Sequence, residues 1–136
     1  MAGEIVTGLA EIVLWSRDVE RSLAFYRDIF GLQPMAQAET VKPRFLLVAQ
    51  GGGAVPQMLV LVPHPDPTGA FPAAKPARPL HHLAFSVTRE RYEALAEACR
   101  NVGLEVRGGL HPVLPNVSTF YVDDPDGNEL EVIAPT

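Results

Sequence analysis

The carboxylate best suited to chemistry in this sequence is Glu131, which lies in an apolar stretch near the end of the chain. Residues 119–132 read TFYVDDPDGNELEV, which predicts a strand, a tight turn at residues 124–127 and a second strand. Side chains alternate along a strand, so Leu130 and Glu131 face opposite ways. A buried Glu131 needs a partner such as an arginine or a metal ion, whereas an exposed one is simply solvated. The choice depends on what the fold brings to it.

Length, charge and cysteine content exclude several classes of function. The 136 residues are 47% hydrophobic and 20% charged, which fits one folded domain or two small, closely packed halves. A net charge of −5 argues against nucleic acid or an anionic membrane as partner, and favours a small-molecule substrate. Cys99 is the single cysteine, so no intrachain disulfide forms. With no signal sequence or membrane-length apolar run, we expect a cytoplasmic protein.

The first half of the sequence predicts a strand, a helix and three more strands. Residues 5–15 are largely apolar, with Glu11 on the face opposite Ile12, and Asp18 caps a helix that Gly31 ends. The later strands are expected at residues 33–39, 44–49 and 57–62, with a glycine turn at residues 51–53.

The second half repeats this order. Residues 82–87 predict a strand, Thr88 caps the following helix, and Gly103 ends it as Gly31 ends the first. Aligning the two halves places His82 on Glu11, so both side chains should point from matching positions into the same space. His81, one residue earlier, is expected to point to the opposite face.

The repeat defines the expected architecture. We predict an α+β fold in which two βαβββ modules, at about residues 5–62 and 80–134, form a curved, cupped mixed sheet with the helices on its outer face. Six prolines between residues 63 and 79 predict an extended connector without regular structure. The whole chain, residues 1–136, is expected to be a single domain.

Several motifs in this order resemble those of the vicinal oxygen chelate superfamily, which includes glyoxalase I, type I extradiol dioxygenases, fosfomycin-resistance thiol transferases and bleomycin-binding proteins. Together they span nearly the whole chain. They are RDVERSLAFY at residues 17–26, HHLAF at residues 81–85, Phe120 with Tyr121, DPDG at residues 124–127, and Glu131.

The resemblance implies a divalent metal site. In the family the first strand of each half and the last strand supply the ligands, and the matching positions here are Glu11, His82 and Glu131. One nitrogen and two carboxylates suit Fe, Mn, Zn or Ni. Glu11 replaces the usual histidine or glutamine. Glyoxalase I also has a fourth, glutamate ligand, and the matching position near Val60 is apolar, as in the three-ligand dioxygenases and thiol transferases.

The same resemblance suggests catalytic and substrate-binding residues. In extradiol dioxygenases a tyrosine contacts the substrate oxygen and a nearby histidine assists proton transfer, which here points to Tyr121 and His111. The spacing between His111 and Phe120 is one residue too long for that pattern. Trp15, Val13 and Ala84 share the face of the ligands and are expected to line an apolar substrate pocket.

Three functions follow from these expectations. The leading one is a metal-dependent enzyme acting on a small substrate with adjacent oxygens, most like an extradiol ring-cleavage dioxygenase. The second is a glyoxalase-, epimerase- or thiol-transferase-type reaction, and the third is a metal-free antibiotic- or metabolite-binding resistance protein. The resemblance also implies a homodimer, and the site can form within one chain or across two.

Overall fold

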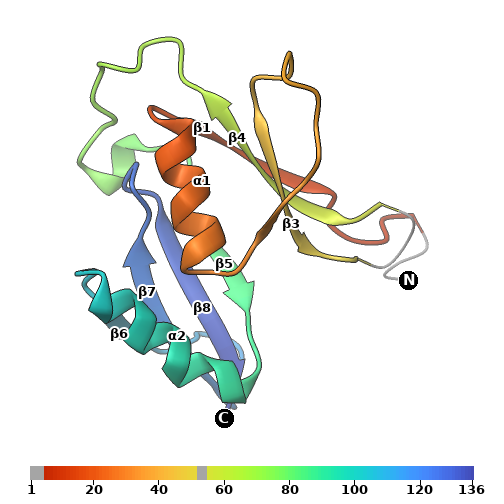
Figure 1. Cartoon of the computed structure of the whole chain (residues 1–136). Coiled ribbons are helices and arrows are strands. Elements are labelled where there is room, and N and C mark those ends of the chain that lie inside the picture. Colours follow the sequence, from red (N-terminus) through yellow and green to blue (C-terminus); the bar gives the residue numbers. More distant parts are fainter. Residues whose placement is uncertain (1–4, 52–54) are drawn as a thin grey trace. The chain divides into compact units, whose positions relative to one another are not determined.

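The computed structural model describes residues 5–51 and 55–136, which fall into two compact units, unit 1 (Met1–Gly69) and unit 2 (Ala70–Thr136). Each unit is one βαβββ module with a four-stranded mixed sheet, which confirms the expected α+β fold (Figure 1). The predicted glycine turn lies, beyond Gly51, outside the described residues. Among those residues, no helix combines the length and apolar character needed to span a bilayer.

Unit 1 has the strand order β1-β4-β3-β2, with β1 parallel to β4. Its elements are β1 (Glu11–Ser16), α1 (Val19–Asp28), β2 (Gln33–Pro34), β3 (Arg44–Ala49) and β4 (Gln57–Pro63). The first strand starts later than predicted, because its partner β4 begins only at Gln57 and residues 5–10 remain exposed. Strand β2 is shorter than predicted, since the side chain of Gln37 accepts the N–H of Phe45 that a longer strand would use.

Helix α1 forms where the sequence predicts it. The Asp18 side chain accepts the Arg21 N–H at 3.1 Å, and Gly31 adopts a φ of +70° just after the helix. Leu23 and Tyr26 are buried on the side of α1 that packs on the sheet, and Leu46, Leu59 and Leu61 are buried in the strands. The apolar spacing of the helix therefore builds the core of unit 1.

Unit 2 has the matching order β5-β8-β7-β6, with β5 parallel to β8. Its elements are the short 3₁₀ helix η1 (Lys75–Ala77), β5 (Leu83–Ser86), α2 (Arg89–Asn101), β6 (Arg107–Gly109), β7 (Val117–Asp123) and β8 (Glu129–Pro135). The connector was expected to lack regular structure, and η1 corrects that expectation. Pro76 lies in the first turn of η1, where its fixed φ is favourable and no N–H is needed.

The core of unit 2 lies between α2 and one face of its sheet. Leu130 and Val132 are fully buried there, as is Cys99 of the helix, and the rings of Tyr92 and Phe120 meet edge to face at 5.2 Å. Figure 1 shows α2 running across this face of the sheet. The opposite face carries the alternate residues of each strand, and these hold the polar groups.

The strand registers agree with the alignment of the two halves. In unit 1 Val13 of β1 pairs with Val60 of β4, and in unit 2 Ala84 of β5 pairs with Glu131 of β8. Glu11 and His82 each lie two residues before the first member of these pairs. They therefore occupy equivalent positions, one in each unit.

Candidate metal site

Glu131 is a buried carboxylate at the centre of the sheet of unit 2. Glu131 as a whole is only 3% exposed to solvent. Oε1 lies 3.1 Å from His82 Nε2, and Oε2 accepts a hydrogen bond of 3.0 Å from the Tyr121 hydroxyl. Within the part of the chain that the structure describes, neither lysine nor arginine pairs with it. Its burial therefore rests on one imidazole and one phenol, which leaves room for a cation.

The hairpin between β7 and β8 fixes the position of this carboxylate. The Asp124 side chain accepts the N–H groups of Asp126 and Asn128 at 2.9 and 2.8 Å, and Gly127 takes a φ of +81°. This turn sets the register that places Glu131 opposite Tyr121. The DPDG signal in the sequence therefore encodes a contact of the site itself.

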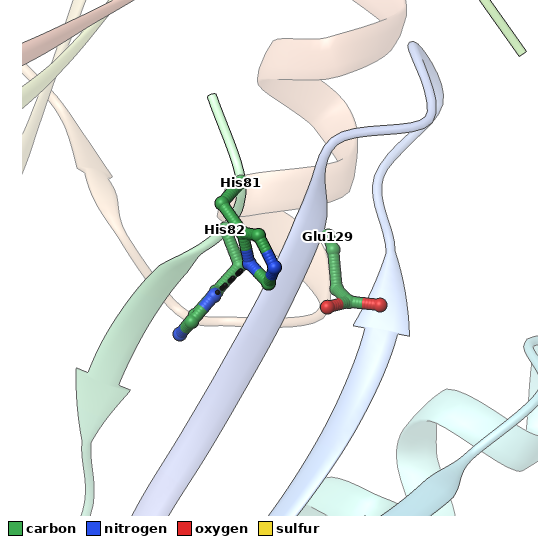
Figure 2. Close-up of side chains that lie close together, drawn as sticks. All are labelled: His81, His82 and Glu129. Atoms are coloured by element: carbon green, nitrogen blue, oxygen red, sulfur yellow. Dashed lines mark hydrogen bonds between the residues drawn. The ribbon is translucent and has the colours of Figure 1, made fainter. Parts of the chain in front are cut away.

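His81 lies against His82, which corrects the expectation that the two point to opposite faces. The two Nδ1 atoms are 2.8 Å apart (Figure 2). Both residues precede β5, which begins at Leu83, so strand alternation does not apply to them. One of the two Nδ1 atoms must carry the shared proton. If His82 donates it, its Nε2 lone pair is available to a metal, so His81 can set the tautomer of His82.

Tyr121 is held as a hydrogen-bond donor. Burial, together with the hydrogen bond to Glu131 and its charge, raises the pKa of the Tyr121 hydroxyl above its usual value, so the phenol keeps its proton at neutral pH. Its ring also meets the ring of His82 edge to face at 5.9 Å. The tyrosine therefore orients one oxygen of Glu131 and leaves the other directed at His82.

Gly109 makes room for the Tyr121 ring, a role that the sequence analysis missed. A Cβ at Gly109 would lie 2.5 Å from Tyr121 Cε2 and 2.9 Å from Thr119 Oγ1, closer than real contacts allow. Its neighbour Gly108 has nothing within 4 Å of such a Cβ. A glycine inside a strand often marks a close approach, so the Gly108–Gly109 pair was the available signal.

A second carboxylate, Glu129, lies beside the histidines but is already neutralised. Ligand atoms of His81, His82 and Glu129 lie within 4.8 Å of one another (Figure 2). Lys75 and Arg107 both form ion pairs with Glu129. Burial alone would raise the pKa of Glu129, but these two cations outweigh it and hold the pKa below its usual value. With two cations already bound, Glu129 is a poorer metal ligand than Glu131.

The chemistry of the donor set fits a divalent ion at His82 and Glu131. Ligand bonds of about 2.1 Å separate two neighbouring donors on one ion by about 3.0 to 3.4 Å, and the measured N···O distance is 3.1 Å. The nitrogen and the carboxylate oxygen suit first-row transition metals. His82 is partly exposed and Glu131 is buried, as in a site open on one side.

Four other residues predicted from the sequence are divided between the two units. Glu11, Val13 and Trp15 share one exposed face of β1 in unit 1, where Trp15 meets His64 edge to face at 5.3 Å. Ala84 is exposed in unit 2 and pairs directly with Glu131. Their roles in metal or substrate binding stay predictions.

His111 is held within its own loop. Its Nδ1 accepts the N–H groups of Val113 and Leu114 at 3.1 and 2.9 Å. Tyr121 pairs with Arg107, the first residue of β6. His111 follows the last residue of β6, at the opposite end of the strand. These two hydrogen bonds hold the loop together, and the role of His111 in proton transfer also stays a prediction.

Solved structures with this fold cover nearly the whole chain. An integron cassette protein from the Halifax Harbour sewage outfall is 25% identical with a TM-score of 0.70, covering 95% of this chain and 99% of its own. A glyoxalase/dioxygenase from Nostoc punctiforme is 20% identical with a TM-score of 0.76, covering 100% and 95%.

A third structure shows a metal in this fold. A variant of FosX, a fosfomycin resistance protein from Listeria monocytogenes, is complexed with Mn(II) and 1S,2S-dihydroxypropylphosphonic acid; it is 21% identical with a TM-score of 0.68, covering 96% of this chain and 92% of its own. The model of the Glyoxalase/Bleomycin resistance protein/Dioxygenase superfamily matches residues 8–132, which include the histidine, tyrosine and glutamate described above. The chain therefore belongs to the Glyoxalase/Bleomycin resistance protein/Dioxygenase superfamily.

Proposed function

We propose that this protein is a divalent-metal-dependent enzyme that acts on a small substrate with two adjacent oxygens. The observation that carries the proposal is the buried Glu131 carboxylate, 3.1 Å from His82 and paired within the described residues with no lysine or arginine. Superfamily membership and the Mn(II) in the FosX structure support it. The third ligand predicted from the sequence, Glu11, remains part of the proposal.

The residues of unit 2 have distinct roles in this proposal. His82 Nε2 and Glu131 Oε1 would hold the ion, which would act as a Lewis acid toward both substrate oxygens. Tyr121 keeps Glu131 Oε2 occupied, so the carboxylate presents one oxygen to the ion. When substrate is bound, the single proton of this hydroxyl can go to a substrate oxygen instead of Glu131. By accepting the Nδ1 proton of His82, His81 would leave His82 Nε2 available to the ion.

The reaction class follows less directly from the geometry. An extradiol dioxygenase remains the leading candidate, supported by a three-ligand set with apolar Val60 at the fourth position. The second candidate is a glyoxalase-, epimerase- or thiol-transferase-type reaction, which needs no dioxygen. The loop contacts of His111 favour this second class, since its imidazole is engaged with Val113 and Leu114. A metal-free binding protein is the third candidate.

Metal titration of two matched variants tests the ligand assignment. Glu131→Gln should lower the affinity for Mn(II) and Zn(II) about a hundredfold or more, because it removes an anionic ligand. Glu129→Gln is the matched control, since it makes the same change two residues away on the same face. It should lower the metal affinity far less, because Lys75 and Arg107 already neutralise that carboxylate. The reverse order would assign the ion to His81, His82 and Glu129, and no metal binding at all would favour the metal-free binder. Glu11→Gln tests the third ligand in the same titration.

Oxygen uptake then separates the two enzyme classes. Protein loaded with Fe(II) or Mn(II) is mixed with a panel of catechols in an oxygen electrode. Uptake that Tyr121→Phe reduces would support the dioxygenase. No uptake, together with turnover of a hemithioacetal or an epoxide, would assign the protein to the second class.

A further inference from the structure

Unit 2 contains a pocket of about 420 Å³ beside the candidate metal site. His81 and Glu129 line it, and His81 contacts His82 through the ring nitrogens. A volume of this order suits a small organic ligand. The pocket is therefore placed to hold a part of the substrate that lies next to the reacting oxygens.

The charged lining of the pocket is predominantly cationic. Three cations, Lys75, Arg78 and Arg107, face two carboxylates, Asp123 and Glu129. The two carboxylates are both engaged, Glu129 by Lys75 and Arg107, and Asp123 by Arg107 at 2.8 Å. In a protein with a net charge of −5, this local excess of positive charge is the opposite of the overall balance.

Arg78 is the third cation of the lining, and it takes no part in these ion pairs. Its Nε donates to the Pro72 carbonyl at 2.6 Å and its Nη1 to the Asp126 carbonyl at 3.2 Å. Both acceptors are neutral, and among the described residues no carboxylate forms an ion pair with it. The other N–H groups of this half-buried guanidinium make no further hydrogen bond within the described residues, so they are available to an incoming anion.

The turn that positions Glu131 also positions Arg78. A Cβ at Gly127 would lie 2.7 Å from Arg78 Nη2 and 3.1 Å from its Nη1, so only glycine lets the guanidinium lie this close to the turn. The same turn leads into β8, which carries both Glu129 and Glu131. One short segment therefore both contacts the guanidinium and leads into the strand that carries Glu131.

We propose that this pocket binds the anionic group, a carboxylate or a phosphonate, of a substrate whose adjacent oxygens reach His82 and Glu131, with Arg78 as its main anchor. The position of the substrate oxygens rests on the proposed function. The binding of an anion does not, because every residue that carries it lies outside the metal ligands.

Anion binding is tested first without metal. Benzoate and phenylphosphonate are titrated calorimetrically into the metal-free protein, with benzyl alcohol as the neutral analogue of similar size. We expect at least one anion to bind about tenfold or more tightly than benzyl alcohol, as a charge-assisted hydrogen bond predicts. The better of the two identifies the anionic group. If neither anion binds more tightly than benzyl alcohol, the proposal is wrong.

Two variants assign this binding to the pocket. Arg78→Gln should abolish the preference for the anion, whereas Arg89→Gln should keep it, since Arg89 contacts Ser118 and Glu93 away from the pocket. A second variant covers the case in which Arg78→Gln does not fold. Ala73→Glu leaves Arg78 in the sequence and adds a carboxylate to the lining, so it should also weaken anion binding. An unchanged preference in the folded variants would contradict the proposal.

A matched pair of substrates connects the pocket to the metal site. With Mn(II)-loaded protein, 3,4-dihydroxybenzoate should bind about tenfold more tightly than catechol, which differs only by the carboxylate. Dihydroxypropylphosphonic acid against propane-1,2-diol provides the same comparison for a phosphonate. Equal affinities within both pairs would overturn the assignment of the pocket to the substrate. Failure of the protein to bind metal would instead refute the proposed function and leave the anion result intact.

Discussion

A row of directly paired residues crosses the sheet of unit 2, and the equivalent row in unit 1 carries side chains of a different chemical kind. In unit 2 it runs from Ala84 through Glu131 and Tyr121 to Arg107. In unit 1 the equivalent row runs from Val13 through Val60 and Phe45 to Met35, whose N–H donates to the Phe45 carbonyl. Three polar side chains in one unit are thus matched by three apolar ones in the other.

This difference shows how one module can be used twice. The helix side is apolar in both units, because each must bury a core against its helix. The other face can diverge, and among the described residues unit 2 alone combines an acid, a phenol and an imidazole there through hydrogen-bond contacts. Unit 1 contributes Glu11 at the position equivalent to His82, beside exposed Val13 and Trp15. We infer that unit 2 carries most of the chemistry.

The largest expected effect comes from making unit 1 resemble unit 2. Val60→Glu would bury a carboxylate at a position that is 3% exposed, with Phe45 where unit 2 has Tyr121. We expect the free energy of unfolding to fall by about 3 kcal/mol or more, because a buried carboxylate is costly and Phe45 has no hydroxyl to donate to it. Urea denaturation measures this loss.

The control for this variant is Val13→Glu. It introduces the same group on the adjacent strand, at a position that is 50% exposed. There the carboxylate stays hydrated, so stability should change by less than about 1 kcal/mol. Equal losses for the two variants would mean that the row in unit 1 is not the apolar equivalent of the row in unit 2.

The next effect tests how unit 2 holds its tyrosine. Gly109→Ala would place a Cβ 2.5 Å from the Tyr121 ring, and we expect about 1 to 3 kcal/mol of destabilisation, as overpacking produces. Gly108→Ala, with open space at its Cβ, should cost less than half as much. Urea denaturation measures both. If the ring moves aside easily, the two variants will match, and Gly109 has no role in positioning Tyr121.

The smallest effect is the pH dependence that Glu129 of unit 2 gives to the stability of the protein. The pKa of Glu129 is lowered in the folded protein, so its ion pairs stabilise the fold above the pKa of the unfolded chain, and this contribution is lost as the pH falls through the folded pKa. Its equivalent in unit 1 is Met58, which does not titrate. Glu129→Gln should therefore lower stability by about 1 kcal/mol near pH 6, and this difference should shrink as the pH falls through the folded pKa of Glu129. Denaturation of both proteins across this range measures the difference, and a deficit that persists at low pH would contradict the assignment.

Much of the fold could be predicted from local signals. Asp18 and Thr88 accept the hydrogen bonds expected of helix caps, and Gly31 and Gly103 end the helices with positive φ. These features depend on a few neighbouring residues, so the sequence contains all the information needed. The same holds for the turn after Asp124. The repeat likewise predicts that His82 and Glu11 occupy equivalent positions, and the strand registers agree.

Other parts of the site depend on contacts between distant residues, which local patterns do not encode. Lys75 lies in a connector where the prolines predicted no structure, yet it pairs with Glu129, 54 positions later. Arg78 likewise meets the turn at Gly127. His81 contacts His82 because the strand begins one residue later than expected.

What the sequence determined by itself is the set of elements, their order and the placement of Glu131 on the face opposite the core, because each follows from spacing along the chain. What only the tertiary structure decided is which carboxylate is free for a cation. Glu129 and Glu131 are equivalent in the sequence pattern, two residues apart on one face. Folding brings Lys75 and Arg107 to the first and His82 and Tyr121 to the second, so their chemical roles diverge.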